Sequence, residues 1–362
     1  MNDVAASRFR PFEVLSKVRE SATITSFHLV PLDASHWRPF EAGQFLTLRV
    51  PDAKGGHVLR NYTVSSSPRQ AGQYRITVKR EAAPSGEVPQ GLSSCWLHDE
   101  VEPGAVIEID LPRGGFRLDA ASTRPVVLLS GGVGLTPTVS MLDVLARESE
   151  RPVWFIHACD NAEVHALRDE VEALAASRPG ISVHFCYRFA GDGDRCHSNG
   201  FLSRATLQSL LPLDDYDIYM CGPPPFMQAL YGILTGLGVR KERIAYEFFG
   251  PASLLTAESE TPAQKAPPAP APVAADDGGV RIVLEKSGRS FAWDGESESI
   301  LAFLEAQGIE PAFSCRAGVC GTCEQGLVSG EVDYFEEPLD EMPSDRVLLC
   351  CTRPKSSVVL DL

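Results

Sequence analysis

PAFSCRAGVCGTC, residues 311–323, decides the fold of the C-terminal part of the chain. Its three cysteines follow a C-x4-C-x2-C spacing, and Cys350 stands further on in LLCCTRP. This spacing is typical of sites that hold a two-iron, two-sulfur cluster. Three thiolates on one tight loop can reach such a cluster, and Gly318 and Gly321 let backbone N–H groups face the sulfurs. The sequence therefore predicts a [2Fe–2S] site with the ligands Cys315, Cys320, Cys323 and Cys350.

Two other metal centres fit this segment less well. A zinc ribbon prefers paired C-x-x-C knuckles, and this segment has only one, so zinc is disfavoured. A Rieske centre needs two histidine ligands. All eight histidines of the chain precede Phe201, which excludes that reading.

The segment Val280–Leu362 resembles a plant-type ferredoxin domain in PAFSCRAGVCGTC and in the C-x-x-x-P pattern from Cys350 to Pro354. The resemblance implies a β-grasp fold. It also implies that Cys350, rather than Cys351, is the fourth ligand, with Cys351 in a packing role.

Composition narrows the class of protein. The 362 residues are 44% hydrophobic and 22% charged, as in ordinary soluble proteins of two or three domains. The net charge of −15 makes nucleic acid an unlikely partner. We see neither a signal peptide nor an apolar run long enough to span a bilayer, so we expect a cytoplasmic protein without a membrane partner.

Acidic residues are concentrated after residue 279, where 15 acidic and 7 basic residues give a net charge of −8. Several of them follow one another closely: Asp333, Glu336, Glu337, Asp340 and Glu341. We expect this acidic segment to face a basic patch, either on a partner protein or on the rest of the chain.

Residues 256–279 are rich in proline and alanine and have no hydrophobic periodicity, so we interpret them as a linker.

The part of the chain before the linker changes its pattern of strands and helices near Ser122. Short strand-like runs separated by Pro and Gly turns come first, with one helix at Leu92–Asp99, and they predict an antiparallel barrel. Strands and helices then alternate, including a helix expected at Glu163–Ala176, and this pattern predicts a doubly wound parallel sheet. The predicted fold class is thus multidomain α+β and α/β, with domains at 1–121 (flavin-binding β-barrel), 122–255 (nucleotide-binding), 256–279 (linker) and 280–362 (β-grasp ferredoxin).

The strand residues Arg60-Asn61-Tyr62-Thr63 resemble the RxY[ST] signature of the ferredoxin–NADP reductase superfamily. The chemistry suits a flavin, since a guanidinium can bind its phosphate and an aromatic ring can stack on its planar ring system. The resemblance places the hydroxyl of Thr63 near flavin N5. It is strengthened by GLSSCWLHDEV from Gly91, where Gly91 and Ser94 match the helix start that faces the flavin pyrophosphate, although Ser94 could simply cap its helix. Phe45 and Lys79 join the predicted flavin-binding residues on the same resemblance.

GGVGLTP follows a predicted strand and is the form that this superfamily uses for nicotinamide nucleotides. The glycines would allow close approach to a pyrophosphate, Thr136 could cap the following helix, and Pro137 suits its first turn. The predicted nucleotide-binding residues of this loop are Gly132, Val133, Gly134, Leu135, Thr136 and Pro137.

Cys221-Gly222-Pro223 resembles the CGP motif that lies beside the nicotinamide ring in the same superfamily. The segment Tyr246-Glu247-Phe248-Phe249-Gly250-Pro251 resembles the reductase terminus of flavohaemoglobins, where a phenylalanine matching Phe249 lies by the flavin. That family carries FAD, so FAD is favoured over FMN. The resemblance assigns Thr63 to the N5 environment, and Cys221 and Glu247 to the hydride-transfer site. Nitric oxide dioxygenase activity is not implied, because a ferredoxin-like segment stands here in place of an upstream haem-binding globin.

These segments together indicate an NAD(P)H-dependent reductase that passes electrons through FAD to a [2Fe–2S] cluster and on to a partner. A Rieske-type oxygenase or demethylase is the expected acceptor, and a hybrid-cluster protein, a cytochrome P450 or a desaturase are the alternatives. In another alternative, the body is a flavin reductase or diaphorase and the C-terminal segment is a docking domain. The choice between NADH and NADPH stays open. Arg188 and Arg195 are candidate ligands for the 2′-phosphate of NADPH, whereas the resemblance to flavohaemoglobins favours NADH.

Overall fold

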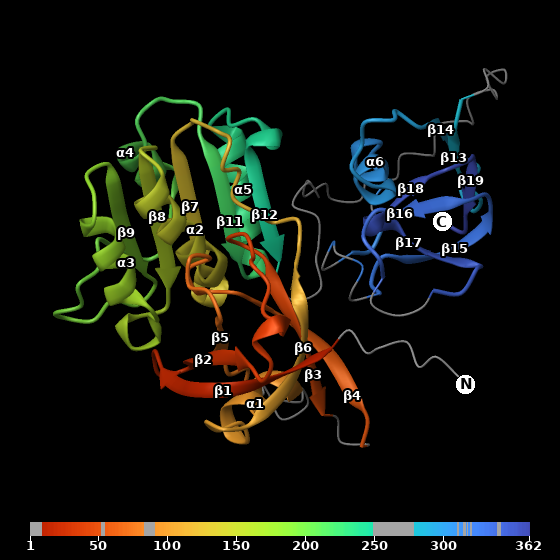
Figure 1. Ribbon diagram of the computed structural model, residues 1–362. Coiled ribbons are helices and arrows are strands. Elements are labelled where there is room, and N and C mark those ends of the chain that lie inside the picture. Colours follow the sequence, from red (N-terminus) through yellow and green to blue (C-terminus); the bar gives the residue numbers. More distant parts are fainter. Residues whose placement is uncertain are drawn as a thin grey trace. The chain divides into compact units, whose positions relative to one another are not determined.

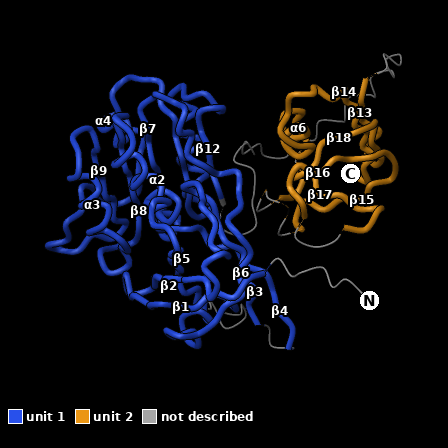
Figure 2. Tube along the Cα trace, viewed as in Figure 1, with its two compact units in different colours: residues 1–249 blue, residues 250–362 orange. Residues whose placement is uncertain are grey.

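The computed structural model describes residues 9–51, 55–82, 91–248, 279–309, 311–313, 316, 318, 321–338 and 342–362. The chain forms two compact units, Met1–Phe249 and Gly250–Leu362 (Figure 2). The first unit contains both the predicted barrel and the predicted parallel sheet. The second contains the predicted ferredoxin segment. The predicted linker at 256–279 lies almost wholly outside the described residues.

The first half of unit 1 is an antiparallel sheet with the strand order β4-β3-β6-β1-β2-β5 (Figure 1). Its strands are β1 (Arg10–Arg19), β2 (Ile24–Pro31), β3 (Phe45–Pro51), β4 (His57–Thr63), β5 (Tyr74–Lys79) and β6 (Val106–Arg113). A bridge between Val64 and Ile76 joins the two edges of the sheet, so the strands close into the predicted barrel. Large apolar side chains such as Phe12, Phe27 and Leu48 fill its interior. The short helices η1 (Ala34–His36) and α1 (Leu92–Asp99) complete this half.

The second half is a parallel sheet with the strand order β10-β9-β8-β7-β11-β12. The order reverses on either side of β7, which creates the crevice where such sheets bind ligands. The strands are β7 (Val126–Gly131), β8 (Val153–Cys159), β9 (Ile181–Tyr187), β10 (Ser198–Asn199), β11 (Asp217–Gly222) and β12 (Ile244–Phe248). The helices are η2 (Gly132–Gly134), α2 (Leu135–Glu148), η3 (Ala162–Val164), α3 (Arg168–Ala176), α4 (Arg204–Leu210), α5 (Pro224–Gly236) and η4 (Lys241–Arg243).

The single helix expected at Glu163–Ala176 is wrong. The chain makes the short turn η3 and then starts α3 only at Arg168. Between them Leu167 is buried with φ +54°, a left-handed conformation that interrupts a helix. The strand β10 and the helix α4 were not predicted.

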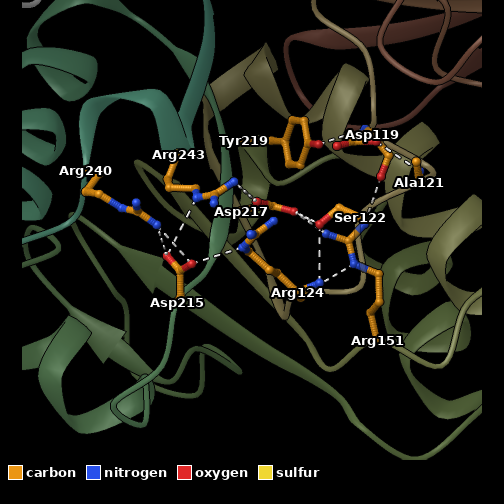
Figure 3. Close-up of polar contacts among 10 residues, drawn as sticks. All are labelled: Asp119, Ala121, Ser122, Arg124, Arg151, Asp215, Asp217, Tyr219, Arg240 and Arg243. Carbon is orange, nitrogen blue, oxygen red and sulfur yellow. Dashed lines mark hydrogen bonds and ion pairs between the residues drawn. The ribbon is translucent and has the colours of Figure 1, made fainter.

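Polar contacts fix the connection between the two sheets (Figure 3). The guanidinium of Arg151 pairs with Asp217 at 2.7 Å and donates to the carbonyl of Asp119 at 3.0 Å. The backbone N–H of Asp119 donates to the hydroxyl of Tyr219 at 2.8 Å, and Ser122 donates to Asp217. Arg151 and Asp217 are almost fully buried, so the ion pair and its hydrogen bonds hold the connection in one conformation.

Unit 2 has a five-stranded mixed sheet in the order β14-β13-β19-β15-β17 and a two-stranded sheet of β16 and β18. Its elements are β13 (Arg281–Leu284), β14 (Ser290–Ala292), α6 (Ile300–Ala306), β15 (Glu324–Ser329), β16 (Val332–Tyr334), β17 (Arg346–Leu348), η5 (Leu349–Cys351), β18 (Thr352–Pro354) and β19 (Val358–Leu360). The buried face of α6, with Ile300, Phe303 and Leu304, packs in one core with strand residues such as Ile282 and Leu360. A sheet folded around one helix in this way is the predicted β-grasp. In the described part of the chain, no helix is both long and apolar enough to cross a membrane.

Candidate functional site

Strand β4 carries the predicted flavin signature on two faces. Thr63 pairs across the sheet with Phe45, and Tyr62 pairs with Leu46. Thr63 is 4% exposed, and its hydroxyl oxygen has no hydrogen-bond partner within the described structure. An unpartnered buried hydroxyl costs free energy, so a hydrogen-bonding ligand at this position would relieve a cost. The residue therefore fits the predicted contact with flavin N5.

Tyr62 is held by a second element. Its hydroxyl lies 2.8 Å from the hydroxyl of Ser93 on α1. Burial raises the pKa of Tyr62 to about 12, so the phenol is neutral at physiological pH. The ring also packs against the barrel core. It is thus a fixed aromatic surface of the kind that stacking on a flavin requires.

The other predicted flavin-binding residues differ in their surroundings. The exposed Arg60 donates to the carbonyl of Leu59 at 2.8 Å, and no carboxylate of the described residues pairs with it, so it can accept a phosphate. Asn61 accepts a hydrogen bond from Thr47, and the part-exposed Lys79 pairs with Glu81 at 3.2 Å. The predicted contacts of both residues with the flavin stay predictions.

The start of α1 is closely packed but has no side-chain cap. A Cβ at Gly91 would lie 2.6 Å from the hydroxyl of Ser94, so only glycine fits there without a shift. Because Gly91 stands at the N-cap position, Ser94 does not cap α1. It accepts from the N–H of Glu81 at 3.1 Å and donates to the carbonyl of Gly91 at 3.3 Å, tying the helix to the chain after β5. The uncapped first turn can bind an anion such as a pyrophosphate.

The nucleotide loop forms the turn η2 at the switch point of the parallel sheet. Gly132 has φ +54° and open space around its missing Cβ, which fits close approach of a ligand. Gly134 is also required for packing, because a Cβ there would lie 2.3 Å from the carbonyl oxygen of Cys221; its predicted contact with the nucleotide stays a prediction. It lets the loop pack directly on the end of β11.

The first residues of α2 also differ from the prediction. The helix begins at Leu135, with Gly134 in the capping position, so Thr136 is not the cap. Its hydroxyl donates to the carbonyl of Val133 at 3.2 Å. Pro137 does lie in the first turn, where it removes no helical hydrogen bond. Val133 packs against the core, and Leu135 is buried within it.

Cys221 is fully buried at the end of β11, beside Glu247 of the parallel neighbour β12. Burial, and secondarily the Glu247 carboxylate, raises the pKa of the Cys221 thiol well above its ordinary value. The sulfur is therefore a protonated thiol and not a nucleophile.

The residues that follow Cys221 lead into the next helix. Gly222 packs against the ring of Phe226, and Pro223 precedes α5 as its capping residue. Phe248 ends β12, while Phe249 and Gly250 lie outside the described residues.

The cluster loop is described in part, since Cys315 and Cys320 lie outside the described residues. Arg316 and Gly318 both have positive φ, at +52° and +67°. The N–H of Gly318 donates to the sulfur of Cys350 at 3.4 Å, and Cys323 and Cys350 are both buried. An N–H donor aimed at a sulfur is what a cluster-bound thiolate needs.

The neighbouring Cys351 is placed differently. Its sulfur faces the carbonyl of Leu348 at 3.7 Å, as a thiol donor would, and a Cβ on Gly318 would lie 3.1 Å from it. This arrangement favours Cys350 as the ligand and Cys351 as a packing residue. The ligand set itself stays a prediction.

Sequence reasoning missed two residues near the flavin signature. Ser93 was not distinguished from other polar helix residues, although it is 4% exposed. Arg75 stands in the alternating strand YRITVK, where an arginine reads as solvent-facing, yet its side chain is 11% exposed. Its side chain lies between Ser65 of the barrel half and Glu170 of α3.

Three family models match the chain. They are an oxidoreductase FAD-binding domain over residues 11–118, an oxidoreductase NAD-binding domain over 128–231 and a 2Fe-2S iron-sulfur cluster binding domain over 282–355. The three matches agree with the cofactors that the sequence predicted, namely FAD, a nicotinamide nucleotide and [2Fe–2S].

Similar proteins divide into two kinds. A flavohemoprotein of Halalkalibacterium halodurans is 40% identical over 253 residues, which are 68% of this chain and 61% of that protein. The flavohem-like FAD/NAD-binding domain of nitric oxide dioxygenase from Vibrio cholerae is 37% identical with a TM-score of 0.61, and the match covers 67% of this chain and 99% of that one. Phthalate dioxygenase reductase is 26% identical with a TM-score of 0.56, and the match covers 98% of both chains. The chain thus matches about three fifths of the curated flavohemoprotein, whereas it matches the reductase from end to end.

Proposed function

The chain belongs to the ferredoxin–NADP reductase superfamily, with a flavohaemoglobin-type FAD/NAD-binding body and a C-terminal [2Fe–2S] domain, and from this premise we propose its reaction. It takes electrons from NAD(P)H, passes them through FAD to the cluster and delivers them to a separate acceptor protein. The observation that carries the proposal is the buried, unpartnered hydroxyl of Thr63 at the end of a flavin signature. A hydrogen bond between this hydroxyl and flavin N5 would satisfy the buried oxygen.

FAD, when bound, accepts a hydride from the nicotinamide and can release its two electrons one at a time. The chain supplies the binding and orientation. Tyr62 offers a neutral ring fixed by Ser93, and the N-cap residue of α1, Gly91, has no side chain to cap the backbone N–H groups of the first turn. Gly132 admits the nucleotide to the turn η2, while the neutral thiol of Cys221 contributes no charge to the hydride-transfer site. At the other end, the N–H of Gly318 stabilises negative charge on the sulfur of Cys350.

The proposed acceptor is a terminal oxygenase of the Rieske type. The end-to-end similarity to phthalate dioxygenase reductase supports this choice. Purified candidate acceptors, assayed for coupled NADH oxidation, test it. Transfer to a cytochrome P450, a desaturase or a hybrid-cluster protein instead would correct the acceptor and leave the reductase activity standing.

The acidic segment of unit 2 is the proposed docking face for that acceptor. Asp333 and Glu337 are exposed, and Phe335 between them is 43% exposed. The N–H of Phe335 donates to the carbonyl of Cys351 at 3.2 Å, so this face adjoins the residue that follows the predicted ligand Cys350. Asp340 and Glu341 lie outside the described residues. Acceptor reduction should slow as salt is raised, and a rate that stays flat across the salt series would argue against the face.

The relay is tested by replacing a predicted ligand. Cys320→Ser should abolish cytochrome c reduction and keep ferricyanide reduction, since the one-electron exit is lost while the flavin still works. Unchanged reduction of both acceptors would instead support a flavin reductase with a docking domain.

A further inference from the structure

Arg75 on β5 joins the barrel to the nucleotide-binding sheet. Its two terminal nitrogens lie 2.6 and 2.9 Å from the two carboxylate oxygens of Glu170 on α3. The contact is therefore bidentate, the arrangement in which arginine holds a carboxylate most rigidly. The Arg75 side chain is 11% exposed and that of Glu170 is 35% exposed, so the arginine is nearly buried and the carboxylate is partly open to water.

The same guanidinium holds the chain that leaves the flavin signature. It donates to the hydroxyl of Ser65 at 3.1 Å and to the Ser65 carbonyl at 2.6 Å. Ser65 is only two residues beyond Thr63. Arg75 thus connects Glu170 of the nucleotide half to the segment that directly follows β4 and Thr63.

The next two residues extend this connection. The hydroxyl of Ser140 donates to the Ser66 carbonyl at 2.9 Å, and the Ser67 hydroxyl donates to Asp143. Ser140 and Asp143 lie on α2, the helix that starts at the nucleotide loop. The strand β5 also lies next to the turn η2 of that loop.

The position of Glu170 depends on a strained turn. Leu167 adopts its left-handed conformation immediately before α3, and Glu170 then falls in the first turn of the helix. A carboxylate in the first turn of a helix interacts favourably with the helix dipole, and the same carboxylate is the one that Arg75 holds. A buried leucine with positive φ persists only where the surrounding packing requires it.

We propose that Arg75 and Glu170 are positioning residues for hydride transfer, which rests on the reductase function proposed above. The pair fixes the position of the Thr63 end of β4 relative to the nucleotide loop. It thereby fixes the distance and orientation between the bound flavin and the nicotinamide. Stability alone is a weak reason for such a pair, since buried ion pairs often contribute little net stability. Hydride transfer, in contrast, is sensitive to displacements of about 1 Å, which can cost about a hundredfold in rate.

The test uses full-length variants with a matched control. Glu170→Gln removes the negative charge. Arg75→Lys keeps the positive charge but cannot form the bidentate contact. The control is Glu148→Gln, because Arg69 and Glu148 form a 2.9 Å pair across the same two halves but are 57% and 47% exposed. Flavin reduction is followed under anaerobic conditions at saturating NADH and NADPH. A second readout, hydrogen exchange of the flavin-free protein, follows residues 63–67.

We expect the rate constant for flavin reduction to fall at least about tenfold in Glu170→Gln and Arg75→Lys, with a change of less than about twofold in the dissociation constant of the nucleotide. Exchange at residues 63–67 should speed up in both variants, and Glu148→Gln should match the wild type in all measurements. A Glu170→Gln protein that reduces flavin at the wild-type rate overturns the inference, even if it melts earlier. An equal slowing in Glu148→Gln overturns it as well. Wild-type protein whose flavin neither nucleotide reduces would instead refute the proposed function itself.

Discussion

The hydroxyls of Tyr62 and Ser93 lie 2.8 Å apart and join β4, the strand of the flavin signature, to α1, the helix predicted to face the flavin pyrophosphate. Two parts of one cofactor would therefore be bound by elements that hold each other. We infer that flavin binding depends on this hydrogen bond as well as on the residues that touch the flavin.

Tyr62→Phe keeps the ring and removes the hydrogen bond. We expect a loss of about 1 kcal/mol of stability and a several-fold weaker binding of FAD, measured by fluorescence titration of the flavin-free protein. Ser93→Ala should have a similar effect, and the double variant should add little, because the two hydroxyls form one bond. Fully additive losses would contradict a shared role.

Replacing Thr63 should change stability and the rate of flavin reduction in opposite directions. Thr63→Val replaces a buried, unpartnered hydroxyl with a methyl group of similar size. The flavin-free protein should gain about 1 kcal/mol in its free energy of unfolding, measured with urea, whereas flavin reduction by NADH should slow. Thr63→Ser should restore the rate. Destabilised flavin-free Thr63→Val protein would show that the hydroxyl already has a partner.

The buried histidines His157 and His165 should make the free energy of unfolding depend on pH. Burial lowers the pKa of His157 to about 4, and burial with the neighbouring His157 and Arg168 lowers that of His165 to about 2. Because the unfolded chain binds these protons near pH 6.5, the stability that both groups provide is present above pH 6.5 and is lost as the pH falls toward those values. Between pH 6.5 and pH 5 each histidine should cost about 2 kcal/mol. His157→Gln should flatten this slope in urea unfolding series, and an unchanged slope would mean that His157 does not titrate in this way.

Replacing Cys350 and replacing Cys351 should have different effects on the cluster. Cys350→Ser should lose the visible absorption of the cluster, while Cys351→Ser should retain it with reduced stability, because the Cys351 sulfur packs under Gly318 and faces a carbonyl. Iron content per chain provides an independent check. The reverse pattern would assign the fourth ligand to Cys351.

The sequence was most informative where short motifs and regular periodicity coincide. The barrel, the parallel sheet and the β-grasp domain were all predicted, since alternation, glycine turns and cysteine spacing are local signals. The broken helix before α3 was not, because a positive φ at a buried leucine has no signature in composition. The separate role of Gly134 could not be foreseen either, since it depends on the carbonyl of Cys221, which is distant in sequence. Arg75 was missed for the same reason, as its partner Glu170 lies on another sheet's helix.

Anaerobic titration with NADH and NADPH, followed by visible and EPR spectroscopy, tests the central claim most directly. We predict that the nucleotide bleaches the flavin and that the EPR signal of a reduced [2Fe–2S] cluster then appears, in the flavin-loaded protein and not in the flavin-free protein. A cluster that dithionite reduces, but that stays EPR-silent while the nucleotide bleaches the flavin, would contradict the proposed path of electrons.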